Sequence, residues 1–381
     1  MAPLAWSQLK KEPVRLLVAS AGVAFAVILV FMQLGFNDAL FDSAVRVHER
    51  LVADLVLISP RSFYLAAMSS FSRRRLYQAA GFAGVSEVVP VYTGIAPWIN
   101  PYTGRPRLIF VAGFDPSRRA FDIPAVNEQV DKIRAPNQVL FDALGRPEFG
   151  PVAEDLRAGK LVTTEVTHWK ITVAGLFEMG TSFGVDATLM TSDLNFLRVF
   201  GARPKGLIDI GLIRLQPGVD PQITRDALAA FLPKDVEVLT KQGFMEREKA
   251  YWRDSTPIGF VFAFGSIMGL VVGGVIVYQI LFADISAHMA EYATLKAMGY
   301  RNSFLFSVVL QEACILAFLG YLPGLAAAVA LYRFTEQATR LPLHMTWPLG
   351  GKVLVLTVAM CSVAGLIAVR KVRSADPAEI F

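Results

Sequence analysis

The sequence predicts a membrane α-helical protein with four transmembrane helices, one followed by three, and a mixed α/β extracytoplasmic domain inserted after the first. Hydrophobic residues make up 54% of the 381 residues and charged residues only 18%, below the roughly 25% of soluble domains. The sequence contains four apolar runs, and each is about as long as the roughly 20 helical residues needed to cross a hydrocarbon core. A long polar stretch with strand and helix patterns separates the first run from the rest.

The first apolar run covers residues 16–36. A cleaved signal peptide is the alternative, because basic residues precede the run and Ala24-Phe25-Ala26 resembles a small-residue cleavage site. The run continues well past that site, whereas the apolar region of a signal peptide usually has about 7–15 residues. We therefore expect a transmembrane anchor. Residues 1–15 read as an amphipathic leader on the inner membrane surface, with a disordered basic leader as the alternative.

Residues 37–256 read as a mixed α/β domain. Short β-branched and aromatic runs bounded by Pro, Gly or Asn predict strands. An amphipathic pattern over 220–232, with Asp220 as its cap, predicts a helix, and residues 241–255 predict a second helix that leads to the membrane. The predicted strands are 53–59, 86–99, 107–114, 171–177 and 207–215.

Three further apolar runs, 257–282, 304–331 and 353–369, complete the four spans. Basic residues in short loops favour the cytoplasmic side. The leader, the 283–303 connection and the 370–381 tail carry Lys10, Lys11, Arg15, Lys296, Arg301, Arg370, Lys371 and Arg373, whereas the 332–352 loop carries fewer. Both chain ends are therefore expected in the cytoplasm and the large domain outside the inner membrane.

Several function classes are disfavoured by what the sequence lacks. The G-x-x-x-x-G-K-[ST] loop that holds nucleotide phosphates does not occur, and the four histidines are scattered rather than spaced as metal ligands. The net charge of +5 is not gathered on one predicted face, so a nucleic-acid partner is not expected. Cys314 and Cys361 lie in apolar runs and read as packing residues. The chain is expected to be no enzyme, to need no metal or cofactor, and to receive energy from a partner.

Small residues mark helix contacts in the apolar runs. Gly265, Gly269 and Gly273 recur every four residues, a spacing that lets another helix backbone approach closely. The alternatives are a homodimer seam and packing within one chain. Gly320 and Gly324 have the same four-residue spacing in the third span, where Pro323 is expected to bend the helix.

Glu312 is a carboxyl residue inside the third span. Charged residues in lipid are costly and usually face the interior of a helix bundle. A structural, hydrogen-bonded role is the favoured interpretation, and a proton relay is the alternative.

The 283–303 connection reads as an amphipathic cytoplasmic helix that Gly299 ends. An apolar stripe flanked by Glu291 and Lys296 suits insertion into a groove of an ATPase, and the alternative is a helix that only lies on the membrane. The stripe residues are Ile285, Met289, Tyr292, Leu295 and Met298.

Within that connection, Glu291–Tyr300 (EYATLKAMGY) resembles the segment after the second span of DevC-type ABC transporter permeases, in the FtsX/MacB superfamily of mechanotransmission transporters. Further similar segments occur in the same order along the chain and cover most of its length. They are FMQLGF (31–36), ADLVLIS (53–59), FSRRRLYQA (71–79), TPIGFVFAFGSIMGLVVG (256–273) and VVLQEACILAFLGYLPG (308–324).

The resemblance implies the partners and the mechanism. Two permeases would form a homodimer with two copies of a separate ABC ATPase, which binds the ATP. A periplasmic membrane-fusion adaptor and a TolC-like outer-membrane channel would complete an efflux pump for a glycolipid or another hydrophobic cargo. Related families leave two alternatives open: an FtsX-like relay that drives a periplasmic hydrolase without transport, and LolC/LolE-like lipoprotein release.

Overall fold

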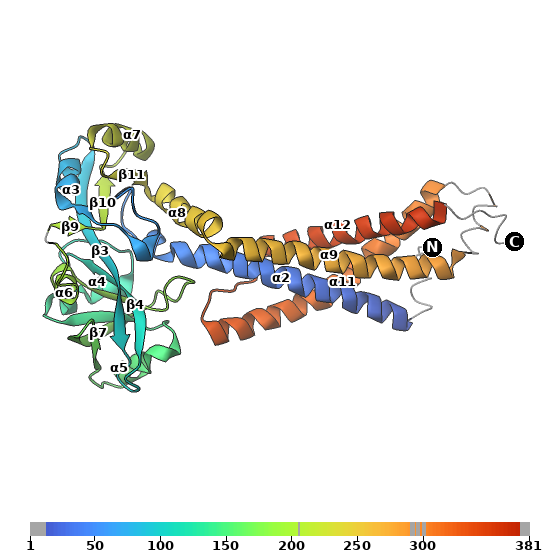
Figure 1. The fold of residues 1–381 in the computed structure, drawn as a ribbon, viewed down its shortest axis with the longest axis horizontal. Helices are drawn as coiled ribbons and strands as arrows, with labels where there is room; N and C mark the ends of the chain where they lie inside the picture. The colour runs from blue at the N-terminus through green and yellow to red at the C-terminus, as the bar shows by residue number, and fades with distance from the viewer. Residues whose placement is uncertain (1–12, 205, 290–293, 295–297, 299–301, 374–381) are drawn as a thin grey trace. The chain divides into compact units, whose positions relative to one another are not determined.

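A computed structural model describes residues 13–204, 206–289, 294, 298 and 302–373. The chain divides into two compact units (Figure 1). The helical unit holds the described parts of 1–39, 257–337 and 343–381, and the α/β domain holds 40–256 together with Ala338–Pro342. Because the loop before the last helix belongs to the α/β domain, the chain passes from one unit to the other four times.

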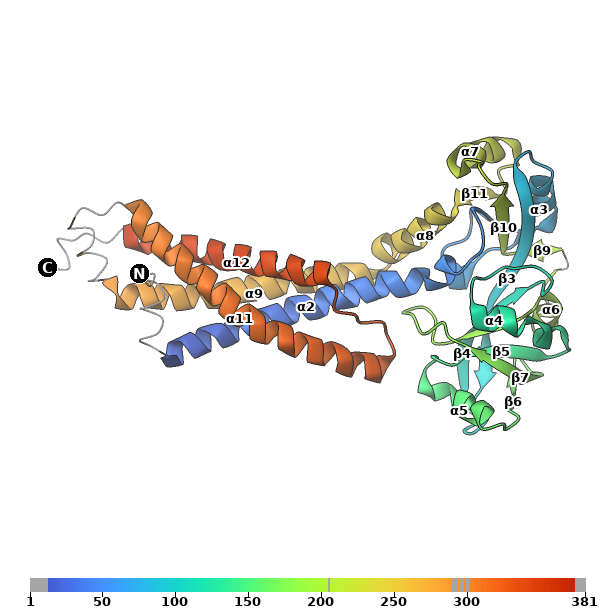
Figure 2. The same cartoon turned by 180° about the vertical axis from the view of Figure 1, so that it is seen from behind.

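Four helices of the described chain are long and apolar enough to cross a membrane (Figures 1 and 2). This confirms the predicted one-plus-three arrangement. Each helix is longer than its predicted span, because helix geometry continues beyond the apolar run at one or both ends. The four helices are α2 (Pro13–Glu49), α9 (Pro257–Ala287), α11 (Asn302–Thr339) and α12 (Trp347–Arg373).

The α/β domain contains one mixed sheet of nine strands and a separate two-stranded pair, counted over the described residues. The strand order of the large sheet is β11-β1-β10-β3-β4-β8-β5-β7-β6. The strands are β1 (Leu55–Ile58), β2 (Phe71–Ser72), β3 (Val85–Ile99), β4 (Pro106–Phe114), β5 (Gln138–Asp142), β6 (Thr163–Val166), β7 (Trp169–Phe177), β8 (Thr188–Ser192), β9 (Leu207–Ile208), β10 (Ile210–Leu215) and β11 (Glu237–Thr240).

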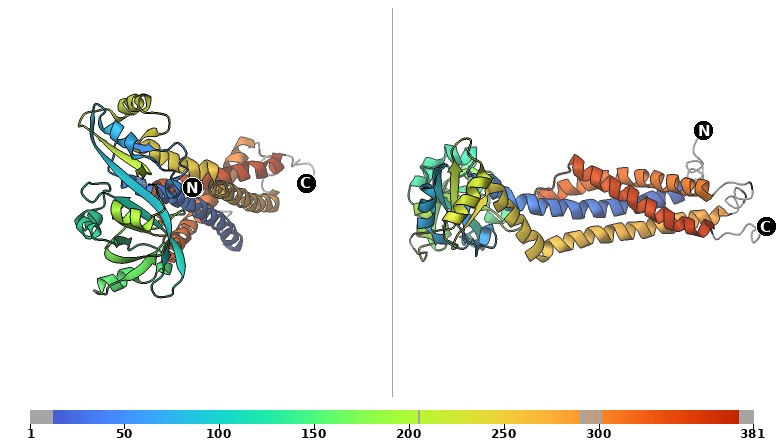
Figure 3. Two further views of the ribbon diagram at one scale, coloured as in Figure 1. Left: turned by 60° about the vertical axis from the view of Figure 1, so that its left-hand side comes forward. Right: turned by 90° about the horizontal axis from the view of Figure 1, so that it is seen from above.

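Part of the sheet closes into a ring of six strands. Strand β3 is the long blue-green strand that crosses the domain in Figure 3 (left). It pairs along one edge with β4, and along the other first with β10 and then, at Trp98, with Val166 of β6. Because β4 leads through β8, β5 and β7 back to β6, the Trp98–Val166 pair joins the two ends. Trp98 is fully buried and its ring lies 5.2 Å from that of Phe141.

Short helices cover both faces of the sheet, and each face has its own apolar core. Alternate residues of β1 serve the two cores: Leu55 and Leu57 pack on one face, Val56 and Ile58 on the other, as the two-residue period of a strand requires. The covering elements are α3 (Arg73–Ala80), α4 (Pro124–Glu128), α5 (Val152–Arg157), α6 (Asp193–Val199), α7 (Pro221–Phe231), α8 (Lys241–Ala250), and the turns η1 (Leu65–Ala67), η2 (Val130–Arg134), η3 (Pro147–Phe149) and η4 (Tyr251–Ser255).

Local predictions for this domain are largely confirmed. Asp220 caps α7, because its carboxylate accepts hydrogen bonds from the backbone N–H groups of Gln222 and Ile223. Two predictions need correction. The strand expected over 207–215 breaks at Asp209 into β9 and β10, and the helix expected over 241–255 changes to one π-helical turn at Tyr251–Ser255.

Candidate functional site

The glycine ladder of α9 packs against α2 of the same chain. A Cβ added at Gly265 would meet the Gln33 amide, one at Gly269 would touch Leu29 and Val30, and one at Gly273 would overlap Ala26 and Met360. Every neighbour belongs to the helical unit of this chain. These contacts correspond to the second interpretation, packing within one chain, whereas a contact with a second copy stays a prediction. The glycines' lack of side chains serves the close approach of α2 and α12 within one protomer.

A second glycine pair holds α11 against the other side of α2. A Cβ at Gly320 would lie 2.5 Å from Val23 Cγ1 and 3.1 Å from the Ser20 carbonyl oxygen. A Cβ at Gly324 would lie 2.8 Å from Val27 Cγ1. Pro323 between them is exposed, and α11 continues through it from Asn302 to Thr339.

Buried hydroxyl groups add contacts that the sequence did not suggest. The Tyr332 hydroxyl on α11 donates to the Phe31 carbonyl oxygen on α2, close to Gly35, which leaves room for the ring. The Tyr321 hydroxyl donates to the Gly350 carbonyl oxygen of α12 at 2.9 Å. Each bond satisfies a phenol that would be costly to bury alone. Helix α2 is thus fixed to both α9 and α11.

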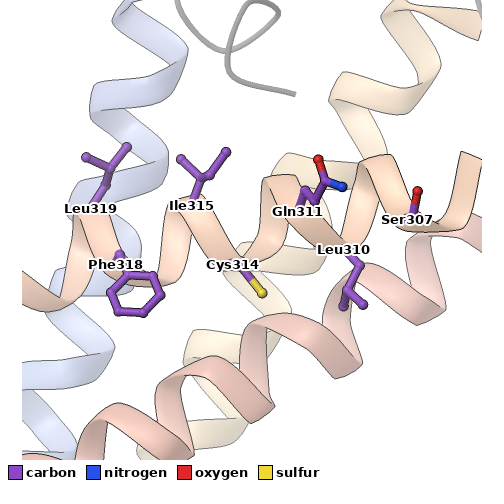
Figure 4. A pocket seen from close by; sticks show the side chains of 7 residues that line it. All are labelled: Ser307, Leu310, Gln311, Cys314, Ile315, Phe318 and Leu319. Carbon is purple, nitrogen blue, oxygen red and sulfur yellow. The ribbon is translucent and has the colours of Figure 1, made fainter. Parts of the chain in front are cut away.

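Glu312 is fully buried on α11, so its side chain lies inside the helical unit, where an intramembrane carboxyl was expected. On a different side of α11 is a shallow apolar hollow of about 700 Å³ (Figure 4). Its lining comes from this one helix and consists of Ser307, Leu310, Gln311, Cys314, Ile315, Phe318 and Leu319.

The predicted coupling segment is only partly described. Ile285 lies in the last turn of α9 and is fully buried, so it packs within the chain and does not belong to an exposed stripe. Met289 is half-buried and Met298 is 62% exposed. The remaining predicted members lie outside the described residues: Glu291, Tyr292, Leu295, Lys296 and Gly299.

A buried polar cluster joins α2 to α8 inside the α/β domain. The Glu248 carboxylate on α8 accepts a hydrogen bond from the Leu65 N–H at 2.9 Å and another from the Trp252 indole N–H at 3.0 Å. His48 Nε2 on α2 lies 3.6 Å from the same carboxylate. Burial raises the pKa of Glu248 to about 7, although the two donated hydrogen bonds oppose the shift. We call these four residues the Glu248 cluster.

A second polar network holds the loop after β7. Asp142, fully buried, accepts hydrogen bonds from the N–H groups of Leu144, Met179 and Gly180. Burial raises the pKa of Asp142 to about 6, against the pull of these bonds and of the Arg46 charge. Arg46 on α2 donates to the Met179 carbonyl oxygen at 2.8 Å. The loop is therefore fixed to both β5 and α2.

The same loop reaches the connection between α11 and α12. The Thr181 hydroxyl donates to the Arg340 carbonyl oxygen at 2.8 Å. Arg340 follows the last residue of α11 and has φ +59°, the left-handed conformation that usually takes glycine after a helix. Four segments thus meet in the α/β domain: α2, α8, the loop after β7, and the loop before α12.

Replacing Arg340 with glycine should raise stability, because the left-handed conformation disfavours a side chain by about 1 kcal/mol. The accepting carbonyl oxygen stays in place, so the Thr181 bond is retained. Thermal unfolding of the detergent-solubilised chain measures the effect. Arg333→Gly, at an exposed position inside α11, serves as a control and should lower stability instead, because glycine disfavours a helix interior. A lower melting temperature for Arg340→Gly would mean that the arginine side chain itself stabilises the loop.

No group of three or more metal-binding side chains occurs in the part of the chain that the structure describes. Glu312, Gly320 and Gly324 are buried on α11, whereas the expected bend at Pro323 and the coupling role of Met289 and Met298 stay predictions. The two polar networks were missed, since Glu248, His48, Asp142 and Arg46 are far apart in sequence and belong to no recognisable motif.

A comparison with known protein families finds a match in the region of the last three helices. Residues 263–377 match the model of the FtsX-like permease C-terminal family. This range covers most of α9, the connection, α11 and α12. The last three helices are therefore similar to the C-terminal domain of FtsX-like permeases. No curated protein matches the chain.

Three solved structures are similar to part of the chain. The periplasmic region of MacB from Actinobacillus actinomycetemcomitans shares 9% identity at a TM-score of 0.36, over 53% of this chain and 95% of its own. The extracellular domain of the noncanonic ABC-type transporter YknZ from Gram-positive bacteria shares 13% identity at a TM-score of 0.33, over 49% of this chain and 99% of its own. A domain of a putative permease protein from Porphyromonas gingivalis shares 13% identity at a TM-score of 0.31, over 50% of this chain and 88% of its own. Likenesses this low assign neither function nor partner.

Proposed function

We propose that this chain is the permease subunit of an ABC-type efflux pump, and that it passes the motion of a separate ATPase to its α/β domain. The match of residues 263–377 to the FtsX-like permease family carries the proposal. The sequence contains no phosphate-binding loop, so the energy of ATP has to enter through contact with another protein. The exposed Met298 in the connection between α9 and α11 offers a point for that contact.

The packing of the helices supports transmission rather than a pore through one chain. Two glycine contacts and the Tyr332 hydrogen bond fix α2 to its neighbours α9 and α11. Helix α2 then continues without interruption from Pro13 to Glu49, across the unit boundary after Ala39. A displacement imposed on α9 and α11 therefore moves α2 as well, and α2 is part of the α/β domain at its other end.

The assembly proposed here follows the resemblance to DevC-type permeases. Two permeases pair with two ATPases, the α/β domain faces the periplasm, and both chain ends lie in the cytoplasm. A membrane-fusion adaptor and a TolC-like channel receive a glycolipid or another hydrophobic cargo. An FtsX-like relay to a periplasmic hydrolase is the second candidate, favoured by the family match itself. Co-purification of an adaptor supports the pump, and co-purification of a hydrolase supports the relay.

Replacing Met298 with aspartate should separate the permease from its ATPase. Burying an apolar side chain of this size is worth about 1.5–3 kcal/mol in area terms, and a charge in an apolar groove adds a desolvation cost. ATPase binding should weaken by about tenfold or more, and export should fall with it. Leu295→Asp, on the same predicted stripe, should behave alike. Co-purification of the ATPase and efflux from the same cells are the measurements.

Thr294→Asp is the matched control for this test. Thr294 is exposed in the same connection and is not one of the apolar residues of the predicted stripe, so its replacement adds a charge without removing an apolar contact. The Thr294→Asp variant should bind the ATPase normally. Normal binding and export in both stripe variants would show that the connection is only a surface element, and the proposed route for the energy of ATP would be wrong.

A further inference from the structure

Two titratable side chains meet where two different helices enter the α/β domain. His48 on α2 is fully buried, and Glu248 on α8 is 3% exposed. His48 Nε2 and Glu248 Oε2 are 3.6 Å apart, slightly beyond a hydrogen bond of ordinary length. The imidazole of His48 has a polar contact with the backbone of Ala44, one helical turn earlier, and Nε2 makes no hydrogen bond of ordinary geometry to the residues that the structure describes. A buried ring nitrogen without a partner is unusual, and one proton on Glu248 Oε2 would give Nε2 a hydrogen bond.

The surroundings offer Glu248 little charge compensation. The Tyr64 and Tyr251 rings stack at 4.6 Å beside the cluster, and burial raises the pKa of Tyr64, helped by the nearby Glu248. Arg46 lines the same small cavity but donates to the carbonyl oxygens of the loop after β7. The only groups that donate hydrogen bonds of ordinary length to the carboxylate, within the described chain, are the Leu65 N–H and the Trp252 indole.

A cavity of about 20 Å³ borders the cluster, which is room for about one water molecule. Its walls come from α2, the turn η1, the loop after β7, strand β8 and α8. The Thr188 hydroxyl on its wall is buried without a hydrogen-bond partner among the described residues. Room for a single water, which can accept or deliver a proton, therefore exists beside the carboxyl group.

We propose that Glu248 and His48 form a proton-sensitive latch, which joins α2 to α8 firmly when the external solution is acidic and loosens when it becomes alkaline. In the closed state Glu248 Oε2 has taken a proton from water and donates it to His48 Nε2, while both carboxyl oxygens keep accepting from Leu65 and Trp252. In the open state the proton has returned to water. A buried carboxylate then remains, and such a charge is costly without a cationic partner.

The direction of the effect follows from linkage. Burial raises the pKa of Glu248 from 4.5 to about 7, so the folded cluster binds more protons than the opened one between these values. Its stabilising contribution is complete below pH 4.5 and is lost as the pH rises through 7. Between pH 6 and pH 8 the equilibrium constant for opening the cluster should increase about tenfold.

The latch lies between the two helices that lead from the α/β domain toward the helical unit. Helix α8 continues through η4 to α9, and α2 is itself one of the four long helices. If the proposed function holds, the latch sets how stiffly motion passes from α9 and α2 to the sheet, so that external pH tunes the pump. The latch itself is a property of the chain alone, and its test needs no ATPase.

Hydrogen exchange of the full chain in lipid nanodiscs tests the latch. After correction for the intrinsic exchange rate, amides of α8 and of residues 44–51 should exchange about tenfold more slowly at pH 6 than at pH 8. Glu248→Gln should abolish this pH dependence. Glu246→Gln, an exposed carboxyl two residues away on α8, should keep it. Equal protection of wild type at both pH values would overturn the proposal.

Infrared difference spectra between pH 8 and pH 6 give a second measurement, which detects the proton on the carboxyl group directly. The wild type should gain a C=O band of a protonated carboxylic acid that Glu248→Gln lacks, beside any band from Asp142, whose pKa is raised to about 6. The Glu248 band should shift in His48→Leu, which removes the imidazole. Absence of the band, or a band that appears without any change in helix protection, would rule the latch out. Loss of ATPase binding in an otherwise pH-sensitive chain would instead contradict only the proposed function.

Discussion

Gly320→Leu is expected to separate α11 from α2 and to destabilise the whole helical unit. Even a Cβ at this position would overlap Val23 and lie 3.1 Å from the Ser20 carbonyl oxygen, and backbone atoms cannot move aside as a flexible side chain can. Overpacking of this kind costs about 1–3 kcal/mol, occasionally more. The shift would also break the Tyr332 hydrogen bond to Phe31 on the same pair of helices. Detergent-induced unfolding and protease sensitivity measure the loss.

Gly351→Leu is the matched control. Gly351 lies inside α12, and a Cβ there meets nothing within 4 Å. The same substitution should therefore be tolerated, with a small gain because leucine favours a helix over glycine by about 0.8–1 kcal/mol. If Gly320→Leu unfolded no more easily than Gly351→Leu, the contact between α11 and α2 would not be what holds the unit together, and the proposed path of motion would lose its basis.

Asp209→Ala should destabilise the α/β domain by about 3–5 kcal/mol, the range found when one partner of a buried ion pair is removed. Asp209 is 1% exposed. Its carboxylate accepts from the Thr93 N–H at 2.7 Å, from the Ser70 hydroxyl at 2.9 Å and from Arg203. Alanine leaves the Thr93 N–H without its acceptor. It also leaves the largely buried Arg203 charge without a carboxylate, with only the neutral Ser70 hydroxyl, the Thr93 carbonyl oxygen and two aromatic rings beside it.

Asp226→Ala provides the comparison for Asp209→Ala. Asp226 pairs with Arg225 on the exposed side of α7, where its side chain is 69% exposed. Ion pairs of this kind contribute about 0–1 kcal/mol. Urea unfolding of the two variants, followed by tryptophan fluorescence because Trp98 and Trp252 are buried in this domain, should give clearly different midpoints. Similar midpoints would mean that solvent reaches the Arg203–Asp209 pair.

The sequence predicted elements best where the pattern is local. Apolar runs located all four long helices, and β-branched runs located β1, β3, β4 and β7 to within about two residues. The break at Asp209 was missed because a polar residue in a strand normally faces water, whereas this one faces Arg203 inside the domain. No sequence pattern within a few residues of Asp209 indicates that Arg203 is its partner.

The candidate site was harder to predict for the same reason. The four-residue glycine spacing correctly indicated close helix packing, but spacing alone does not distinguish a neighbour in the same chain from one in a second copy. Ile285 fitted the amphipathic stripe, yet α9 continues far enough to bury it. Glu248 and His48 are 200 residues apart, and only the fold brings them together.

The ring closed by Trp98 and Val166 also bears on how the domain avoids aggregation. An open sheet has two unpaired edges, and each can template pairing with another molecule. Here β6 is not left free, because Val166 pairs with Trp98 on β3. Strand β11, at the other end of the sheet, is only four residues long, and Lys241 follows it directly. Copies crowded together on a membrane surface are thus given little opportunity to join their sheets. Loss of the Trp98–Val166 pair would expose the kind of edge from which such association begins.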